Sequence, residues 1–219
     1  MRYQYVLWDF DGTLVDTSEG IYKSLRVAFA QMGLKLPSPE ILQQFIGPPL
    51  NYSFQNFIGL PPEEALRATK CFRADYAQDG LFHSQVYPGM ADILKELHAK
   101  GAGVGVATLK PEKMARLLLD RFGLMPLLGT CCGTSGDETA SATKADIIRR
   151  ALGELGCRDL SDAVLIGDTL YDLQGAQDVG IDFISAAYGF GTDPKMEQES
   201  VCVIQNAQQL RSFLFQEDL

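Results

Sequence analysis

Short apolar runs alternate with helix-like segments along most of this chain. The runs typical of buried strands are residues 3–9, 103–107, about 127–132, 163–167, 182–186 and, more weakly, 201–204. Helical patterns lie at residues 111–122, 143–155, 170–179 and 206–215. This alternation predicts a parallel sheet with right-handed helical crossovers, and the nearly continuous apolarity of the strands predicts that both faces of the sheet are covered. We therefore expect an α/β fold built on a doubly wound parallel sheet.

One interval is too long for a simple crossover. Asp11 and Thr108 are 97 positions apart, whereas a complete strand–helix–strand unit takes about 30 residues or a little more. The interval contains no good strand, and its helical patterns are residues 17–32, 38–46, 50–58 and 62–78. The sequence therefore predicts a small α-helical domain at residues 16–82, inserted into a core domain made of residues 1–15 and 83–219.

Composition limits the classes of partner. The net charge of −9 and the pI of about 4.7 repel nucleic acid and anionic membranes, so neither is expected as a partner. A phosphate site would have to supply its own positive charge. The five cysteines form no CxxC pair, which favours reduced thiols in a cytoplasmic protein. No apolar run approaches the ~18 residues of a membrane span, and Asp9 interrupts what would be the apolar region of a signal peptide.

Polar residues follow the predicted strands where each strand ends. The first apolar run, Val6 to Trp8, leads directly into Asp9 and Asp11. These two carboxylates point the same way, because side chains alternate along a strand. Thr108 ends the second strand, and Asp168 follows the fourth. Ligands of open parallel sheets gather at this edge, so the sequence predicts a binding site there.

The residue types in this group suit phosphoryl transfer. Asp9 and Asp168 are hard oxygen ligands for Mg²⁺, and the backbone carbonyl of Asp11 is a further candidate ligand. Lys144 and the Thr108 hydroxyl could hold a phosphate group, with Lys144 offsetting its charge against Asp9. Asp9 could then attack phosphorus as a nucleophile, while Asp11 serves as general acid and base.

Four motifs carry a family resemblance. They are DFDGTLVDT at residues 9–17, the strand ending in Thr108, Lys144, and GDTLYD at residues 167–172. This set resembles the haloacid dehalogenase superfamily of phosphohydrolases, and the insertion after the first motif resembles its type I helical cap. FIGPPL at residues 45–50, Lys110-Pro111 and YGFG at residues 188–191 are similar to the phosphoglycolate-phosphatase-like branch. The likeness covers essentially the whole chain.

The resemblance assigns roles to individual residues. It implies Asp9 as nucleophile and Asp11 as acid/base, with Thr108 and Lys144 on the phosphate. It also implies that Asp9, Asp11 and Asp168 bind Mg²⁺, with Asp172 next to them. Two positions depart from the family pattern. Leu109 stands where relatives often have Ser, and Ala145 stands where Pro often follows the lysine, so Lys110 remains an alternative to Lys144 at the phosphate site.

The implied function is a Mg²⁺-dependent phosphatase acting on a small phosphorylated metabolite, with 2-phosphoglycolate as leading candidate. Alternatives within the superfamily are a 5'-nucleotidase, a pyrophosphatase and a sugar-phosphate phosphomutase. Mutase relatives have a cap histidine ten residues after the second Asp, where this chain has Ile21. A non-enzymatic alternative is a phosphorylated receiver domain, which the Asp-x-Asp pair and the long insertion disfavour. We expect a monomer or a homodimer.

Overall fold

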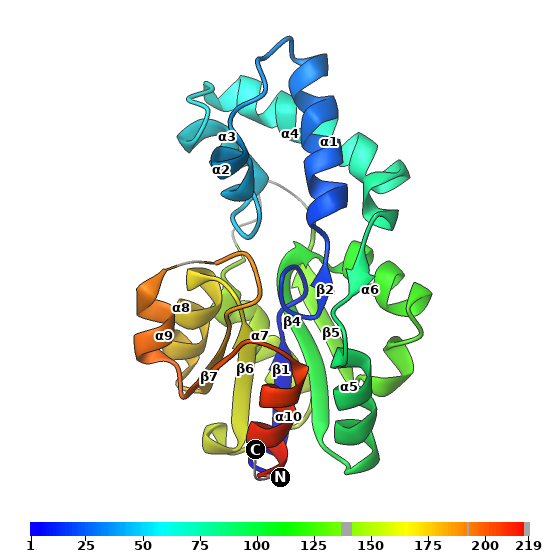
Figure 1. Cartoon of the computed structure of the whole chain (residues 1–219), viewed down its shortest axis with the longest axis vertical. Coiled ribbons are helices and arrows are strands. Elements are labelled where there is room, and N and C mark those ends of the chain that lie inside the picture. The colour runs from blue at the N-terminus through cyan, green and yellow to red at the C-terminus, as the bar shows by residue number, and fades with distance from the viewer. Residues whose placement is uncertain (137–141, 192, 217–219) are drawn as a thin grey trace. The chain divides into compact units, whose positions relative to one another are not determined.

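The computed structural model describes residues 1–136, 142–191 and 193–216 (Figure 1). Its main sheet has six parallel strands in the order β5-β4-β1-β6-β7-β8. The strands are β1 (Tyr5–Trp8), β4 (Gly103–Pro111), β5 (Thr130–Thr134), β6 (Ala163–Gly167), β7 (Asp182–Ala186) and β8 (Cys202–Ile204). The predicted doubly wound α/β fold is confirmed.

The strand order reverses at β1. The chain runs from β1 to β4 and β5 on one side, and then from β6 to β7 and β8 on the other. Trp8, the last residue of β1, is in register with Val106 of β4 and with Ile166 of β6. The residues that follow these positions therefore meet at one edge, where an α/β sheet opens a crevice for ligands.

Helices separate the strands of the main sheet along the chain. They are α5 (Met90–Ala99), α6 (Glu112–Arg121), α7 (Lys144–Glu154), α8 (Leu170–Val179), α9 (Pro194–Glu199) and α10 (Ala207–Phe215), with short 3₁₀ turns η2 (Met125–Leu127) and η3 (Leu160–Asp162). None of the helices in the described part of the chain combines the length and apolarity needed to cross a bilayer.

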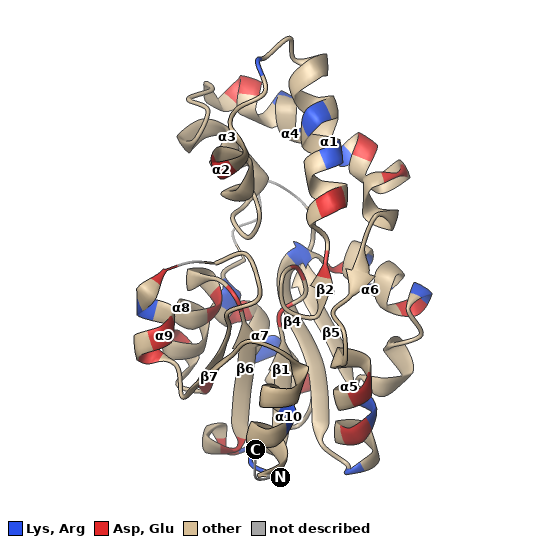
Figure 2. Ribbon diagram, in the orientation of Figure 1, with Lys and Arg blue, Asp and Glu red and all other residues tan. Residues whose placement is uncertain are grey.

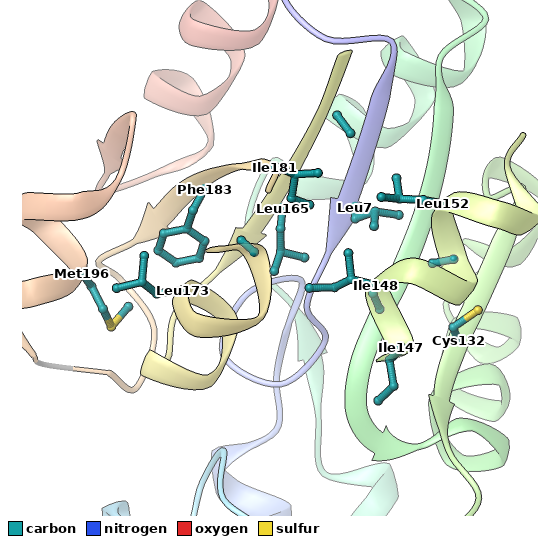
Figure 3. Close-up of a cluster of buried hydrophobic side chains, with 14 residues drawn as sticks. Leu7, Cys132, Ile147, Ile148, Leu152, Leu165, Leu173, Ile181, Phe183 and Met196 are labelled. Atoms are coloured by element: carbon teal, nitrogen blue, oxygen red, sulfur yellow. The ribbon is translucent and has the colours of Figure 1, made fainter. Parts of the chain in front are cut away.

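A continuous apolar cluster joins the sheet to α7 and α8 (Figure 3). Leu7 of β1 and Leu165 of β6 are in register, and they pack with Ile148 of α7 and Leu173 of α8. Val6 and Trp8 point to the opposite face of the sheet, and both are also fully buried. Burial on both faces explains why the strand residues form an apolar run rather than an alternating pattern.

The helical unit comprises residues Asp16–Gln85, and the sheet unit comprises Met1–Val15 and Val86–Leu219. The helices of the helical unit are α1 (Ser18–Gln31), α2 (Pro39–Gln43), α3 (Leu50–Asn56) and α4 (Pro62–Gln78), followed by η1 (Gly80–Phe82). Phe29, Phe45 and Phe54 form its aromatic centre, with ring centroids 5.0–6.2 Å apart. The chain passes between the units within β2 (Val15–Asp16) and β3 (Gln85–Val86), which pair with each other.

Several elements differ from the sequence-based expectation, among them β4, α5 and α9, since α5 and α9 lie in none of the predicted helical ranges. The second strand does not end at Ala107 but continues to Pro111, with a register shift against β5 between these residues. Thr108 and Lys110 interrupt the apolar pattern there, yet both are buried. Helix α5 was not among the predicted ranges, although Met90, Ile93, Leu94 and Leu97 bury one face at helical spacing.

Truncating the central cluster should be costly. Leu165→Ala removes a fully buried side chain, and we expect a loss of about 2–5 kcal/mol in the free energy of unfolding. Leu160→Ala is the matched control, because this side chain is 42% exposed in η3, and it should cost less than about 1 kcal/mol. Urea unfolding of both variants measures the difference, and equal losses would contradict this description of the core.

Candidate active site

Lys144 connects two buried carboxylates. Its Nζ lies 2.5 Å from Oδ1 of Asp9 and 2.5 Å from Oδ1 of Asp172. Asp9 directly follows β1, and Lys144 is the first residue of α7. That helix begins with a capping box between Thr143 and Asp146, which fixes where its first residue lies. Burial alone would lower the pKa of Lys144, but Asp172 and Asp9 raise it, so the lysine is held as an ammonium ion.

Asp168 is held on both carboxylate oxygens. The Thr13 hydroxyl donates to Oδ1 at 2.7 Å, and the Phe190 backbone N–H donates to Oδ2 at 2.8 Å. Asp168 follows β6 and is fully buried. Asp172, in the first turn of α8, accepts hydrogen bonds from the backbone N–H and the hydroxyl of Thr169. The GDTLYD segment therefore fixes two carboxylates by starting a helix immediately after a strand.

Asp9, Asp168 and Asp172 form a carboxylate cluster. One carboxylate oxygen from each lies within 4.8 Å of the others. Burial and then the Asp172 carboxylate raise the pKa of Asp9 to about 7, although Lys144 acts in the opposite direction. Burial, followed by Asp172 and Asp9, holds the pKa of Asp168 well above its usual range. Such crowding of negative charge is relieved by a cation, and an all-oxygen donor set suits Mg²⁺.

Two of the central strands, β1 and β6, contain no charged residue. Figure 2 shows acidic and basic residues on the helices of each unit, whereas β1 and β6 contain none along their length. The charged groups of the cluster begin where these two strands end. This distribution concentrates the local field at the crevice edge of the sheet.

The carboxylate of Asp11 lies on a different lysine. Nζ of Lys110 is 2.9 Å from its Oδ1 and 3.2 Å from its Oδ2. Among the described residues, the cluster that could hold a metal contains Asp172 in place of Asp11. A role for Asp11 in binding Mg²⁺ through its backbone carbonyl stays a prediction. Lys144 contacts Asp9 and Lys110 contacts Asp11, and the assignment of Lys144 rather than Lys110 to the phosphate stays a prediction.

Thr108 is buried on β4, two residues beyond the position that is in register with Trp8. Its Oγ accepts a hydrogen bond of 3.2 Å from the backbone N–H of Lys110. The hydroxyl proton thus remains available in this geometry to an acceptor oxygen. The predicted phosphate contact of Thr108 stays a prediction.

Several supporting residues were not singled out from the sequence. Thr13 lies in the first motif and contributes through its hydroxyl, and Phe190 contributes through its backbone N–H. The Tyr188 hydroxyl donates to the Thr13 carbonyl at 2.7 Å. Gly12 adopts a φ of +86°, and a Cβ there would lie 2.2 Å from Oδ2 of Asp168. The Asp-Gly turn in the first motif was the available signal, because such a position requires glycine.

The raised pKa of Asp9 predicts a pH-dependent stability. The pKa rises from an ordinary value of 3.8 to about 7, so this group's stabilising contribution is present below pH 3.8 and is lost as the pH rises through about 7. In metal-free protein, Asp9→Asn should therefore raise the melting temperature at pH 8, and the gain should shrink towards pH 5. At pH 8 the corresponding gain in the free energy of unfolding is on the order of a few kcal/mol. Asp120→Asn, at an exposed position of α6, is the control. A gain that does not depend on pH would contradict this assignment.

Close packing of α8 against Lys144 predicts a second effect. A Cβ on Gly175 would lie 2.6 Å from Cγ of Lys144, so Gly175→Ala should cost about 1–3 kcal/mol of unfolding free energy. Gly153→Ala in α7 is the matched control, since its Cβ would have no neighbour within 4 Å. That variant should gain up to about 1 kcal/mol from helix propensity. Chemical unfolding of both proteins tests the contrast, which fails if Gly175→Ala is neutral.

The chain is similar in sequence to a known protein family and to several characterised proteins. The family model described as "Haloacid dehalogenase-like hydrolase" matches residues 6–186. A 5'-nucleotidase of Pseudomonas aeruginosa is 33% identical over 196 residues, covering 90% of this chain and 88% of that protein. Tyrosine-protein kinase PtkA of Mycobacterium tuberculosis is 32% identical, covering 93% of this chain and 69% of the kinase. A phosphoglycolate phosphatase of Rhodospirillum rubrum is 28% identical, covering 95% and 90%.

A solved structure has the same fold over its full length. The crystal structure of a predicted phosphatase from Clostridium acetobutylicum has a TM-score of 0.90 and 32% identity, covering 99% of this chain and 100% of that one. The matched segment, residues 6–186, runs from β1 to the end of β7 and so includes Asp9, Lys144 and Asp168. The chain therefore belongs to the haloacid dehalogenase-like hydrolase family and is a phosphatase enzyme of that family.

Proposed function

We propose that the protein is a Mg²⁺-dependent phosphatase that hydrolyses a small phosphomonoester through an aspartyl-phosphate on Asp9. The observation that carries this proposal is the position of Lys144, 2.5 Å from both Asp9 and Asp172, with Asp168 in the same carboxylate cluster. A buried nucleophile that is paired with a cation and surrounded by ligands for a second cation suits an incoming dianion.

The chemistry has two half-reactions. A carboxylate oxygen of Asp9 attacks phosphorus, and the bond between phosphorus and the ester oxygen breaks. The electron pair leaves with that oxygen, which takes a proton from Asp11. Water then attacks phosphorus of the aspartyl-phosphate and passes a proton to Asp11. The bond from phosphorus to Asp9 breaks, which releases inorganic phosphate and restores both aspartates.

The remaining residues hold the phosphoryl group. Lys144 and the Thr108 hydroxyl bind its oxygens, and Asp172 keeps the Lys144 ammonium in place. Mg²⁺ held by Asp9, Asp168 and the Asp11 carbonyl would neutralise charge on the transferring group. Thr13 and the Phe190 backbone fix Asp168 for that purpose. We propose that the helical domain acts as a cap that keeps water away from phosphorus during the first half-reaction. The same domain would select the substrate.

The leading substrate candidate is 2-phosphoglycolate, which is supported by motifs similar to those of that branch and by the name of the Rhodospirillum rubrum relative. A second candidate is a nucleoside 5'-monophosphate, because the Pseudomonas aeruginosa relative named 5'-nucleotidase is 33% identical. Both are small phosphomonoesters and use the same core chemistry. Side chains of the helical domain would decide between them.

A panel of phosphate esters with Mg²⁺ tests this function. We expect kcat/KM to be highest for 2-phosphoglycolate, with nucleoside monophosphates and hexose phosphates as competing members of the panel. Asp9→Asn should lower turnover of every ester by at least about 10⁴-fold, because it removes the nucleophile. Chelation with EDTA should abolish turnover, and Mg²⁺ should restore it.

Asp120→Asn controls for loss of a carboxylate elsewhere, since this residue is exposed on α6. Retained activity in a folded Asp9→Asn variant would refute the assignment of Asp9 as the nucleophile. A preference for nucleoside monophosphates would favour the second candidate. Phosphate that stays on Asp9 for minutes without release would support the receiver-like alternative.

A further inference from the structure

Lys110 forms an ion pair that the proposed chemistry does not yet explain. Its Nζ lies 2.9 Å and 3.2 Å from the two carboxylate oxygens of Asp11. The Lys110 side chain is 4% exposed and that of Asp11 is 18% exposed. A buried ammonium is costly without an anionic partner, so the position of Lys110 is coupled to that of Asp11.

The surroundings of Lys110 hold it in this place. It stands in β4 where the register with β5 shifts, between Ala107 and Pro111. Its backbone N–H donates to Oγ of Thr108, and its Nζ lies 5.6 Å from the centroid of the Phe10 ring. A strand irregularity near a site often redirects a side chain, and here the side chain of Lys110 reaches the carboxylate of Asp11, three residues beyond β1.

The two buried lysines contact different aspartates. Lys144 contacts Asp9 and Asp172, whereas Lys110 contacts Asp11. Lys144 therefore lies with the nucleophile and Lys110 with the acid/base. Both contacts to Asp11 come from the one Nζ of Lys110, and together they hold the two Asp11 carboxylate oxygens beside a single ammonium group.

We propose that Lys110 is a positioning residue that orients the Asp11 carboxyl group towards the leaving-group oxygen; this rests on the proposed function. In the first half-reaction the phosphorus–oxygen bond of the ester breaks, its electron pair goes to the departing oxygen, and the Asp11 proton moves to that oxygen. In the second, the attacking water gives its proton to the Asp11 carboxylate. Lys110 keeps its own protons throughout.

A pair of esters of similar size isolates this role. 4-Nitrophenolate leaves without needing a proton, whereas the alkoxide from benzyl phosphate requires one. Lys110→Met should lower kcat/KM for benzyl phosphate by about 10–100-fold, the range expected for misaligned acid catalysis. It should lower kcat/KM for 4-nitrophenyl phosphate by less than about 3-fold. The inhibition constant of inorganic phosphate should change by less than about 2-fold, because Lys110 does not bind phosphate in this proposal.

Three further proteins sharpen the result. Lys110→Arg should recover part of the loss on benzyl phosphate, since a guanidinium can also pair with Asp11. In an Asp11→Asn background, Lys110→Met should produce little further change in the ratio of the two esters, as residues acting through one another are not additive. Lys113→Met, at an exposed position of α6, should leave both esters unchanged. If Lys110→Met does not fold, Lys110→Gln supplies the same ratio.

Equal losses on both esters, together with weaker inhibition by phosphate, would overturn the proposal and make Lys110 a phosphate ligand. An unchanged ratio with normal kinetics would also overturn it. Failure of the proposed function itself gives a different result, because the wild-type protein would then hydrolyse neither ester, or Asp9→Asn would remain active.

Discussion

Crowding of buried carboxylates around Lys144 is the constraint on which the rest of this site depends. Asp9, Asp168 and Asp172 come within 4.8 Å of one another, a placement that costs free energy unless cations balance it. Lys144 supplies one positive charge from the first residue of α7. Burial, followed by the neighbouring carboxylates, raises the pKa values of Asp9 and Asp168, and a further cation would relieve this repulsion. Glycines and helix-capping residues next to the cluster serve the same arrangement, because they allow Lys144 and the three carboxylates to approach closely.

Holding these groups requires contributions from distant parts of the chain. The Asp168 carboxylate is fixed from one side by Thr13, which follows β1, and from the other by Phe190, which follows β7. Tyr188 connects the same two segments by donating to the Thr13 carbonyl. A loop after one strand thus stabilises the loop after another, and the carboxylate between them is held rigidly. Such support gives the Asp168 carboxylate the fixed geometry that a binding group in an active site requires.

Local pattern was sufficient for much of the fold. The predicted ranges 163–167, 182–186, 62–78 and 170–179 coincide with β6, β7, α4 and α8, since each is a mainly apolar run or a helix with clear start and stop residues. The predicted end of the second strand at Thr108 was wrong, because β4 continues to Pro111, and the reason is physical. Thr108 and Lys110 look like loop residues, but β4 keeps them buried because the sheet and Asp11 provide partners for their polar groups. Pattern reasoning recognises polarity and cannot see such partners.

The sequence by itself determined the fold class, the motif residues and the family, because these depend on periodicity and on residue type at fixed spacing. Tertiary structure alone decided which charge meets which. Lys144 is 135 positions from Asp9, and Lys110 is 99 positions from Asp11, so neither pairing can be read from neighbouring residues. It also placed Asp172 in the carboxylate cluster and gave Thr13 and Phe190 their supporting role. The reason is that ion pairing and desolvation act through space, at distances set by strand order and helix packing rather than by separation along the chain.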